Sequence, residues 1–207
     1  MKSNEIVVDA RVSLVRNLKS ELAESKKRLA EVEAERDVLL AHFSLGLAAL
    51  FDFAQLPSEA PFRIIDGWNA ILHSRAVSKL TSEDISRLKA EYLAARGIVA
   101  PSADTPPSGS CGEVPAMPPL SVWIVFDGAQ ANSYRSGVYR VTYTGGTGAH
   151  RADRMIIDYI HAAKLLGLDV SRITVETVDK SFAKKIADLG ASVEAPHPFH
   201  DNDSKQS

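Results

Sequence analysis

Short apolar runs alternate with stretches of helical periodicity from residue 62 to residue 194, and this alternation constrains the fold more than any other feature. The run Val122–Phe126 is continuously apolar, which is typical of a strand buried on both faces. Strands that alternate with helices imply βαβ units, so we expect an α/β fold whose mainly parallel sheet is flanked by helices. We predict strands at residues 62–65, 122–126, 138–144, 173–178 and 191–194, and helices at 80–96, 151–166 and 181–189.

A heptad repeat without Pro or Gly runs from residue 8 to residue 41 and predicts one long helix before the sheet. Charged residues of both signs stand between the apolar positions, so we predict a homodimer that forms through this helix. The alternative is a solvated amphipathic helix that packs on its own domain. The apolar stretch 43–53 is expected to dock the helix on the domain. The two seam positions hold Val8, Val15, Leu22, Leu29 and Arg36, and Leu18, Ser25, Val32 and Leu39.

Three regions of different character follow from these patterns. We expect an N-terminal helix or coiled coil at residues 1–54, an α/β domain at 59–195 and a disordered polar tail at 196–207. Residues 101–119 hold six of the ten prolines and show no periodicity. They predict a mobile loop inside the domain, because neither flank alone has enough strands for a domain of its own.

The bulk composition excludes several classes of protein. A formal net charge of −2 argues against a uniformly basic nucleic-acid-binding protein but allows a local basic patch. Cys111 is the single cysteine, so intrachain disulfides and cysteine-based zinc clusters are excluded. No apolar run approaches the roughly 20 residues that span a bilayer, and the start lacks a signal-peptide pattern. We therefore expect a cytoplasmic protein that does not contact a membrane.

Aspartates stand at the ends of predicted strands. Asp66 and Asp127 directly follow two of these strands, and a third strand ends next to Asp179. Asp153 lies at the start of a predicted helix. Ligands of open parallel sheets bind outside the carboxyl ends of the strands, so the four acids are expected at one edge. Four carboxylates there would repel one another unless a cation joined them, and oxygen ligands suit Mg²⁺ or Mn²⁺. Such a metal can promote in-line phosphoryl displacement.

Each aspartate also has a simpler interpretation. Asp commonly caps a helix at a strand-to-helix junction, and Asp-Gly occurs in ordinary turns. The pattern alone leaves the metal site and the capping role open.

Four segments resemble motifs of the NYN domain family, within the PIN-like nuclease superfamily and its YacP-like branch. Residues 64–69, Ile-Ile-Asp-Gly-Trp-Asn, look like the family's opening strand-Asp-Gly-Tyr-Asn motif, with Trp68 in the aromatic place. Residues 125–128 look like its second acidic strand end. Residues 143–153 resemble its Tyr-Thr, glycine and Ala-Asp segment, and 177–179 its closing Thr-x-Asp motif. The motifs stand in the family's order across residues 62–195.

This resemblance implies a PIN-like fold and metal-dependent cleavage of RNA. The family often has another acid one turn after the Ala-Asp motif, but position 157 is Ile here. The nearest acid, Asp158, is about 140° around the helix from Asp153. The residues that the resemblance assigns to catalysis and metal binding are Asp66, Asp127, Asp153 and Asp179, with Asn69 orienting the site.

Candidate RNA-binding residues lie around the glycine-rich segment 145–148. Arg151 and Arg154 could bind phosphates, and Thr144 and Gly146 could contact the scissile strand. A flexible turn and a solvated helix start explain the same residues equally well. Arg and Tyr residues before this segment favour single-stranded RNA, through stacking of bases.

We therefore expect a Mg²⁺- or Mn²⁺-dependent endoribonuclease. One alternative is a catalytically weak PIN-like RNA-binding or scaffold protein, oligomerised by its coiled coil, and the missing acid at position 157 favours it. Another is a different phosphoryl-transfer hydrolase, because strand-end aspartates alone do not distinguish the two reactions.

Overall fold

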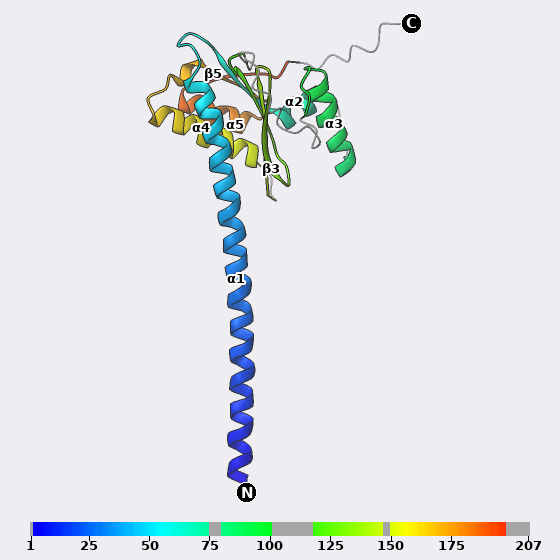
Figure 1. Cartoon of the computed structure of the whole chain (residues 1–207), viewed down its shortest axis with the longest axis vertical. Coiled ribbons are helices and arrows are strands. Elements are labelled where there is room, and N and C mark those ends of the chain that lie inside the picture. The colour runs from blue at the N-terminus through cyan, green and yellow to red at the C-terminus, as the bar shows by residue number, and fades with distance from the viewer. Residues whose placement is uncertain (1, 75–79, 101–117, 147–149, 198–207) are drawn as a thin grey trace, which may run out of the picture. The chain divides into compact units, whose positions relative to one another are not determined.

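The computed structural model describes residues 2–74, 80–100, 118–146 and 150–197 (Figure 1). The chain divides into two compact units, Met1–Leu40 and Ala41–Ser207. Helix α1 (Lys2–Ala54) begins in the first unit and ends in the second.

The second unit is built on a six-stranded sheet with the order β3-β4-β2-β1-β5-β6. Neighbouring strands are parallel except for β3 and β4, which form an antiparallel hairpin. The predicted α/β fold with a mostly parallel sheet is confirmed. The strands are β1 (Phe62–Asp66), β2 (Val122–Phe126), β3 (Ala131–Ser136), β4 (Tyr139–Thr144), β5 (Ile173–Glu176) and β6 (Ser192–Glu194).

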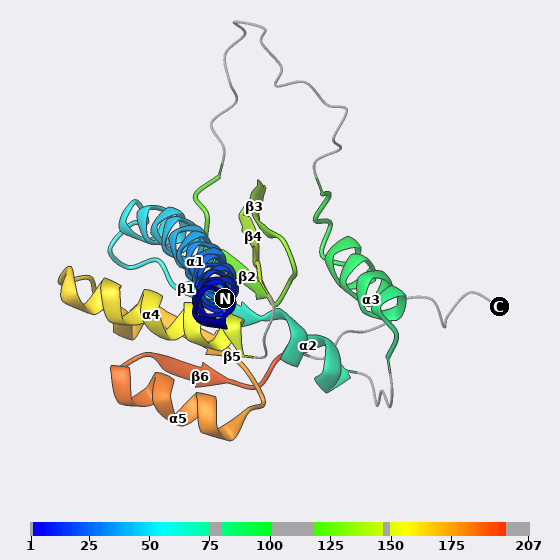
Figure 2. The ribbon, with the colours of Figure 1, turned by 90° about the horizontal axis from the view of Figure 1, so that it is seen from below.

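Helices cover both faces of this sheet (Figure 2). Helices α2 (Gly67–Ser74) and α3 (Ser82–Ala94) pack on one face, and α4 (Arg151–Leu165) and α5 (Lys180–Leu189) on the other. Thr81 caps α3 in a capping box with Asp84, as its Thr-x-x-Asp spacing favours. A short 3₁₀ helix, Val170–Arg172, leads into β5.

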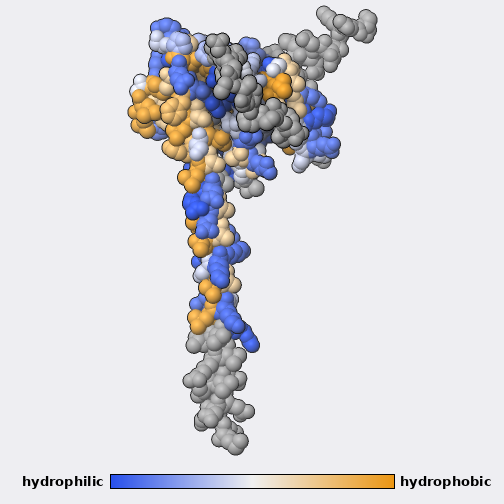
Figure 3. Space-filling model, viewed as in Figure 1, coloured by the Kyte–Doolittle hydropathy of each residue, from blue (hydrophilic) through white to orange (hydrophobic). Residues whose placement is uncertain are grey.

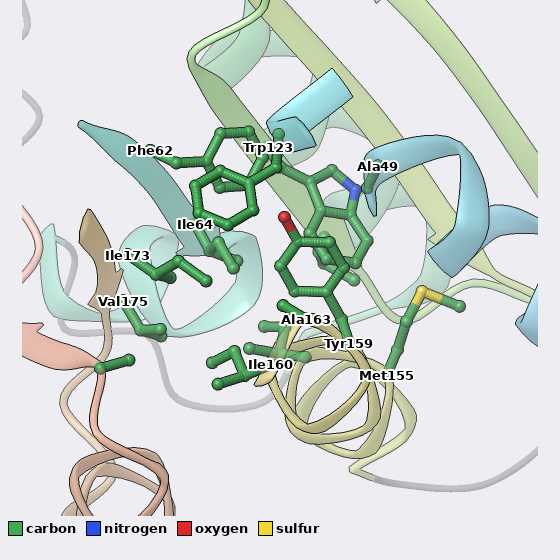
Figure 4. Close-up of a cluster of buried hydrophobic side chains, with 14 of the residues drawn as sticks. Ala49, Phe62, Ile64, Trp123, Met155, Tyr159, Ile160, Ala163, Ile173 and Val175 are labelled. Atoms are coloured by element: carbon green, nitrogen blue, oxygen red, sulfur yellow. The ribbon is translucent and has the colours of Figure 1, made fainter. Parts of the chain in front are cut away.

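The larger core lies between the sheet and α4 (Figure 4). Trp123 of β2 is fully buried there, and its indole N–H donates a hydrogen bond to Thr142 Oγ1 at 2.9 Å. Its ring lies 4.8 Å from that of Tyr159 on α4. Because the Trp123 N–H is satisfied, the ring is buried without leaving an unpaired donor.

The last turns of α1 belong to this core, as expected for residues 43–53. Ala49, Leu50 and Phe53 are buried, and the Phe53 ring lies 5.2 Å from that of Phe62. Beside them Arg140 Nε donates to Asp52 Oδ2 at 2.5 Å. These contacts fix the end of α1 on the sheet.

The prediction that no segment is long and apolar enough to span a membrane needs a correction for helix α1. Its segment Arg16–Ala54 contains an 18-residue window of mean hydropathy 1.5, which is long and apolar enough to cross a membrane. Of that window, 18% is buried inside the structure. This assignment rests on length and composition alone. The core helices of soluble proteins pass the same test, so one such helix is weak evidence for a membrane span.

Three elements differ from the prediction. A turn was expected after Asp66, but α2 begins directly at Gly67 because the Asp66 carboxylate accepts the Asn69 N–H of its first turn. Strand β3 was not predicted, although the Ser136–Gly137 pair is a turn signal between two strands. Strand β5 ends at Glu176, two residues early. Most of the predicted loop (101–117) and tail (198–207) lies outside the described residues.

Within the first unit, apolar side chains of the heptad seam are exposed. Leu18, Leu22, Leu29, Val32 and Leu39 are each 53–61% exposed, and orange and blue side chains alternate along the helix (Figure 3). The pairs Glu24–Arg28 and Lys27–Glu31 flank them at helical spacing. The structure does not describe the side chains of Val8 and Val15, the two other apolar seam positions.

Candidate active site

The carboxyl ends of the parallel strands meet around β1. Strands β2 and β4 lie on one side of β1, and β5 and β6 on the other, so the strand order reverses between β1 and β5. Open α/β sheets bind ligands at such a switch point, outside the carboxyl ends. Asp66 is the last residue of β1 and stands at this point.

Strand alternation directs a row of polar side chains toward α4. Ile64, Val125 and Val175 all belong to the core beneath α4, and side chains two residues apart share a face of a strand. The residues that come two positions later at the strand ends are Asp66, Asp127 and Thr177, and Thr144 follows Thr142 in the same way.

Asp66 is buried and held by Asn69. It is 2% exposed, and its Oδ1 accepts the backbone N–H of Asn69 at 3.2 Å. The Asn69 side-chain amide donates to the other oxygen, Oδ2. These hydrogen bonds from Asn69 fix both carboxylate oxygens of Asp66.

Burial raises the pKa of Asp66 to about 6. The hydrogen bonds from Asn69 lower it, and the charges of Asp153 and Asp127 raise it. Desolvation disfavours the ionised form, and like charges nearby add to that effect. Asp153 and Asp127 thus lie within electrostatic reach of Asp66.

Asp127 and Asp153 are joined through the start of α4. Asp127 Oδ1 accepts the backbone N–H of Ala152 at 2.8 Å, which brings β2 and α4 together at this edge. The next residue, Asp153, lies in the first turn of α4, and its Oδ2 is 3.0 Å from His150 Nδ1. A carboxylate at a helix N-terminus is stabilised by the helix dipole.

Asp179 has a role that sequence interpretation left open. It is the N-cap of α5, and its Oδ1 accepts the N–H groups of Ser181 at 2.7 Å and Phe182 at 3.0 Å. The Phe182 N–H is the largest influence that lowers the pKa of Asp179, and the charge of His150 also lowers it. One oxygen of this carboxylate is therefore used for capping, as the simpler interpretation held.

Asp153 and Asp179 line a common cavity of about 430 Å³. His150, Arg154 and Lys185 line the same cavity, so three basic side chains face the two acids. Arg154, which was predicted to bind phosphate, is one of these three side chains. Lys185 was missed, because on the sequence it is one of several lysines of a solvated helix face.

Asp158 lies away from these acids. Its carboxylate is 3.4 Å from His42 Nε2 and 3.8 Å from Arg154 Nε. It occupies the side of α4 that meets α1, in agreement with its angular offset from Asp153.

Thr144 and Gly146, which were predicted to contact the scissile RNA strand, differ in their surroundings. Thr144 is fully buried, and its Oγ1 has no hydrogen-bond partner among the described residues. Gly146 has φ +75°, and a Cβ there would approach the Arg151 guanidinium carbon to 2.6 Å, so the guanidinium covers this glycine. The Gly146 N–H donates to Ala129 O at 2.9 Å and is therefore not directed at a ligand. Residues 147–149 of the same segment lie outside the described residues.

Lys89 was also missed by sequence interpretation. Its ammonium donates to the backbone carbonyl of Asp127 at 2.5 Å and lies 5.2 Å from the centre of the Phe126 ring. Burial lowers the pKa of Lys89, and the charge of Asp127 raises it. The two residues are 38 positions apart, so no local pattern could have joined them.

The donors at this edge are oxygen atoms of carboxylates, an amide and hydroxyls, which suit a hard divalent cation. Within the described ranges, no group of three or more His, Cys, Asp or Glu side chains lies in an arrangement that could hold a metal. Magnesium often needs only one or two carboxylates, with water and substrate phosphate as the other ligands. The donor chemistry therefore fits such an ion.

No protein-family model, curated protein or solved structure matches this chain.

Proposed function

We propose that this chain is a metal-dependent endoribonuclease of the PIN-like NYN type. The observation that carries the proposal is the buried Asp66 at the switch point of the sheet, with Asn69 on both of its oxygens. Its raised pKa comes partly from Asp153 and Asp127. A buried acid with a perturbed pKa in such a place is typical of a functional site.

The sheet supports this assignment at the level of architecture. Its parallel strands have the order β4-β2-β1-β5-β6, and the four motifs that resemble the NYN family fall at strand ends or helix starts around one edge. This parallel α/β arrangement is the architectural support for the proposal.

A divalent ion, Mg²⁺ or Mn²⁺, would be held by Asp66 and Asp127, with water and substrate phosphate as its other ligands and with Asp153 and Asp179 at the margin. When bound, it supplies a Lewis acid and lowers the pKa of bound water. Asn69 fixes the rotamer of Asp66, and the Ala152 N–H fixes that of Asp127. Such fixed carboxylates need little rearrangement before reaction.

Basic side chains beside the acids would position the RNA backbone. His150, Arg154 and Lys185 line the cavity next to Asp153, where they can bind the phosphates of single-stranded RNA. In hydrolysis a water oxygen bonds to phosphorus while the phosphorus–oxygen ester bond breaks, and the leaving oxygen gains a proton. We further propose a cytoplasmic homodimer that pairs through α1.

The direct test is cleavage of a single-stranded RNA in Mn²⁺ by the full-length protein and by Asp66→Asn. We expect the variant to lose about 100-fold or more in rate, because a preorganised charged group typically contributes this much. Asp158→Asn is the matched control, since Asp158 lies on the same helix as Asp153 but contacts His42. Equal rates for wild type and Asp66→Asn, or no cleavage by either, would refute the proposal.

Two observations favour a second function. Asp179 caps α5 and position 157 lacks an acid, so the acidic set is smaller than in the family pattern. A catalytically weak RNA-binding scaffold, oligomerised by α1, would keep RNA binding in the same assay without cleavage.

A further inference from the structure

A second cavity lies on the sheet face opposite the acids, between α3 and the β3–β4 hairpin. Its volume is about 520 Å³, within the range of small-ligand sites. Gly128 forms part of its wall and directly follows Asp127, so this α3–hairpin cavity reaches the same end of the sheet as the acidic site. The residues used below are Lys89, Gln130, Asn132, Tyr134 and Tyr143.

The wall of the α3–hairpin cavity combines aromatic rings with amides. Tyr134 and Tyr143 supply π surfaces, and the Tyr143 ring is stacked on Phe126 with centres 5.5 Å apart. Gln130 and Asn132 supply exposed amides that can both donate and accept. No acidic side chain is among the described residues that line it. Rings and amides without acids suit a flat, polar-edged, electron-rich group.

Lys89 connects this cavity to the acidic site. It lines the cavity, and its ammonium donates to the carbonyl of Asp127 and lies 5.6 Å from the centre of the Tyr143 ring. A half-buried cation over these rings holds them in place and gives the cavity a positive charge. Because the same Asp127 directs its carboxylate to Ala152, one residue separates the two sites.

We propose that the α3–hairpin cavity holds one unpaired base of the RNA strand whose neighbouring phosphate lies at the acidic edge. This inference rests on the proposed ribonuclease function and names the part of the substrate that selects single strands. A base in a duplex cannot enter, because its edge is paired and both of its faces are stacked. Stacking on the tyrosines holds the ring, and the amides of Gln130 and Asn132 contact the base edge.

The test measures binding separately from cleavage. Fluorescently labelled decaadenylate, decauridylate and an abasic ribose-phosphate decamer are titrated with the full-length chain in EDTA, and anisotropy gives the Kd. All proteins carry Asp66→Asn, which keeps the RNA intact. The double variant Gln130→Ala/Asn132→Ala removes two exposed amides, and Gln55→Ala removes an exposed amide outside the cavity.

We expect the double variant to bind at least one of the two base-containing decamers about ten-fold more weakly, since base contacts typically contribute this much. Its affinity for the abasic decamer should not change.

A second pair of variants tests whether the position of Lys89 matters, and not only the loss of one positive charge. Lys89→Met should weaken binding of the base-containing decamers, whereas Lys164→Met should not, although Lys164 also donates to a backbone carbonyl, that of Leu189.

The outcomes separate this inference from the proposed function. If wild type cuts RNA but both cavity variants bind like their controls, the cavity inference is wrong and the nuclease stands. If the cavity variants lose base-dependent binding while wild type does not cut, the cavity inference holds and the nuclease does not. Equal losses on the abasic decamer, or no binding of any decamer, would overturn the inference.

Discussion

Asp66 combines two features that rarely coexist in a structural residue. It is an acid that is 2% exposed, and among the described residues its hydrogen bonds come from Asn69, three residues later. A buried carboxylate without a basic partner destabilises the fold when it ionises. Asp66 stabilises the start of α2 through Asn69, and the cost of its burial is the ground on which we propose a functional role for it.

The raised pKa of Asp66 predicts how stability depends on pH. Its value of about 6 in the folded chain lies above the ordinary 3.8. The protonated form therefore contributes stability that is fully present below pH 3.8 and is lost as pH rises through 6. In metal-free protein, Asp66→Asn should raise the free energy of unfolding by roughly 2–3 kcal/mol at pH 8, and the gain should disappear toward pH 4. Urea denaturation in EDTA at the two pH values measures it.

Asp158→Asn controls for the loss of a carboxylate at a more exposed place on α4. It should change the free energy of unfolding by much less than Asp66→Asn at pH 8. A gain for Asp66→Asn that is the same at both pH values would mean that Asp66 is not the titrating group.

At the scale of elements, the junction of β1 and α2 sets the geometry of the site. Gly67 begins α2 directly beneath Phe126, and a Cβ there would approach Cδ1 of that ring to 2.7 Å. Phe126 is fully buried and cannot move away easily. The absence of a side chain at Gly67 thus lets the Asp66–Asn69 turn lie close to β2.

Gly67→Ala should therefore destabilise the chain by about 1–3 kcal/mol, as overpacking of a core does. Gly46→Ala is the matched substitution, because Gly46 also lies in a helix but a Cβ there meets nothing within 4 Å. It should stabilise the chain by up to about 1 kcal/mol through helix propensity. Thermal unfolding of both variants gives the comparison, and equal effects would contradict the close approach.

Local patterns predicted the parts of this fold that depend on neighbouring residues. Strand β2 and helix α3 were predicted from the sequence, because the apolar run of the one and the helical periodicity of the other each lie within one element. Strand β3 was missed, since its Ala-Asn-Ser-Tyr-Arg-Ser sequence is mostly polar and it pairs at the edge of the sheet.

Long-range contacts could not be predicted in the same way. The grouping of Asp66 with Asp127 and Asp153 was expected from strand direction, but the cap that Asp179 provides was only one of two interpretations. The contact of Lys89 with the Asp127 carbonyl depends on how α3 packs on β2, which no spacing encodes.

At the scale of the whole molecule, α1 presents its heptad seam to solvent. An exposed row of leucines on a helix is the surface that a second helix covers in a coiled coil. We expect the double variant Leu22→Glu/Leu29→Glu to be monomeric in light scattering where wild type is dimeric.

The matched control for the seam places the same residue beside it. Ala23→Glu/Ala30→Glu adds two charges to exposed positions next to the seam and should leave the dimer intact. A wild-type monomer, or a dimer that survives both double variants, would show that α1 does not pair through this seam.

We propose that Asp66 and Asp127 share one divalent cation at the carboxyl edge of the sheet. The most direct measurement is a Mn²⁺ titration followed by electron paramagnetic resonance of the free ion. Wild type and Asp158→Asn should bind Mn²⁺ alike, and Asp66→Asn and Asp127→Asn should each bind about ten-fold or more weakly. Equal Mn²⁺ affinity in all four proteins would contradict the claim.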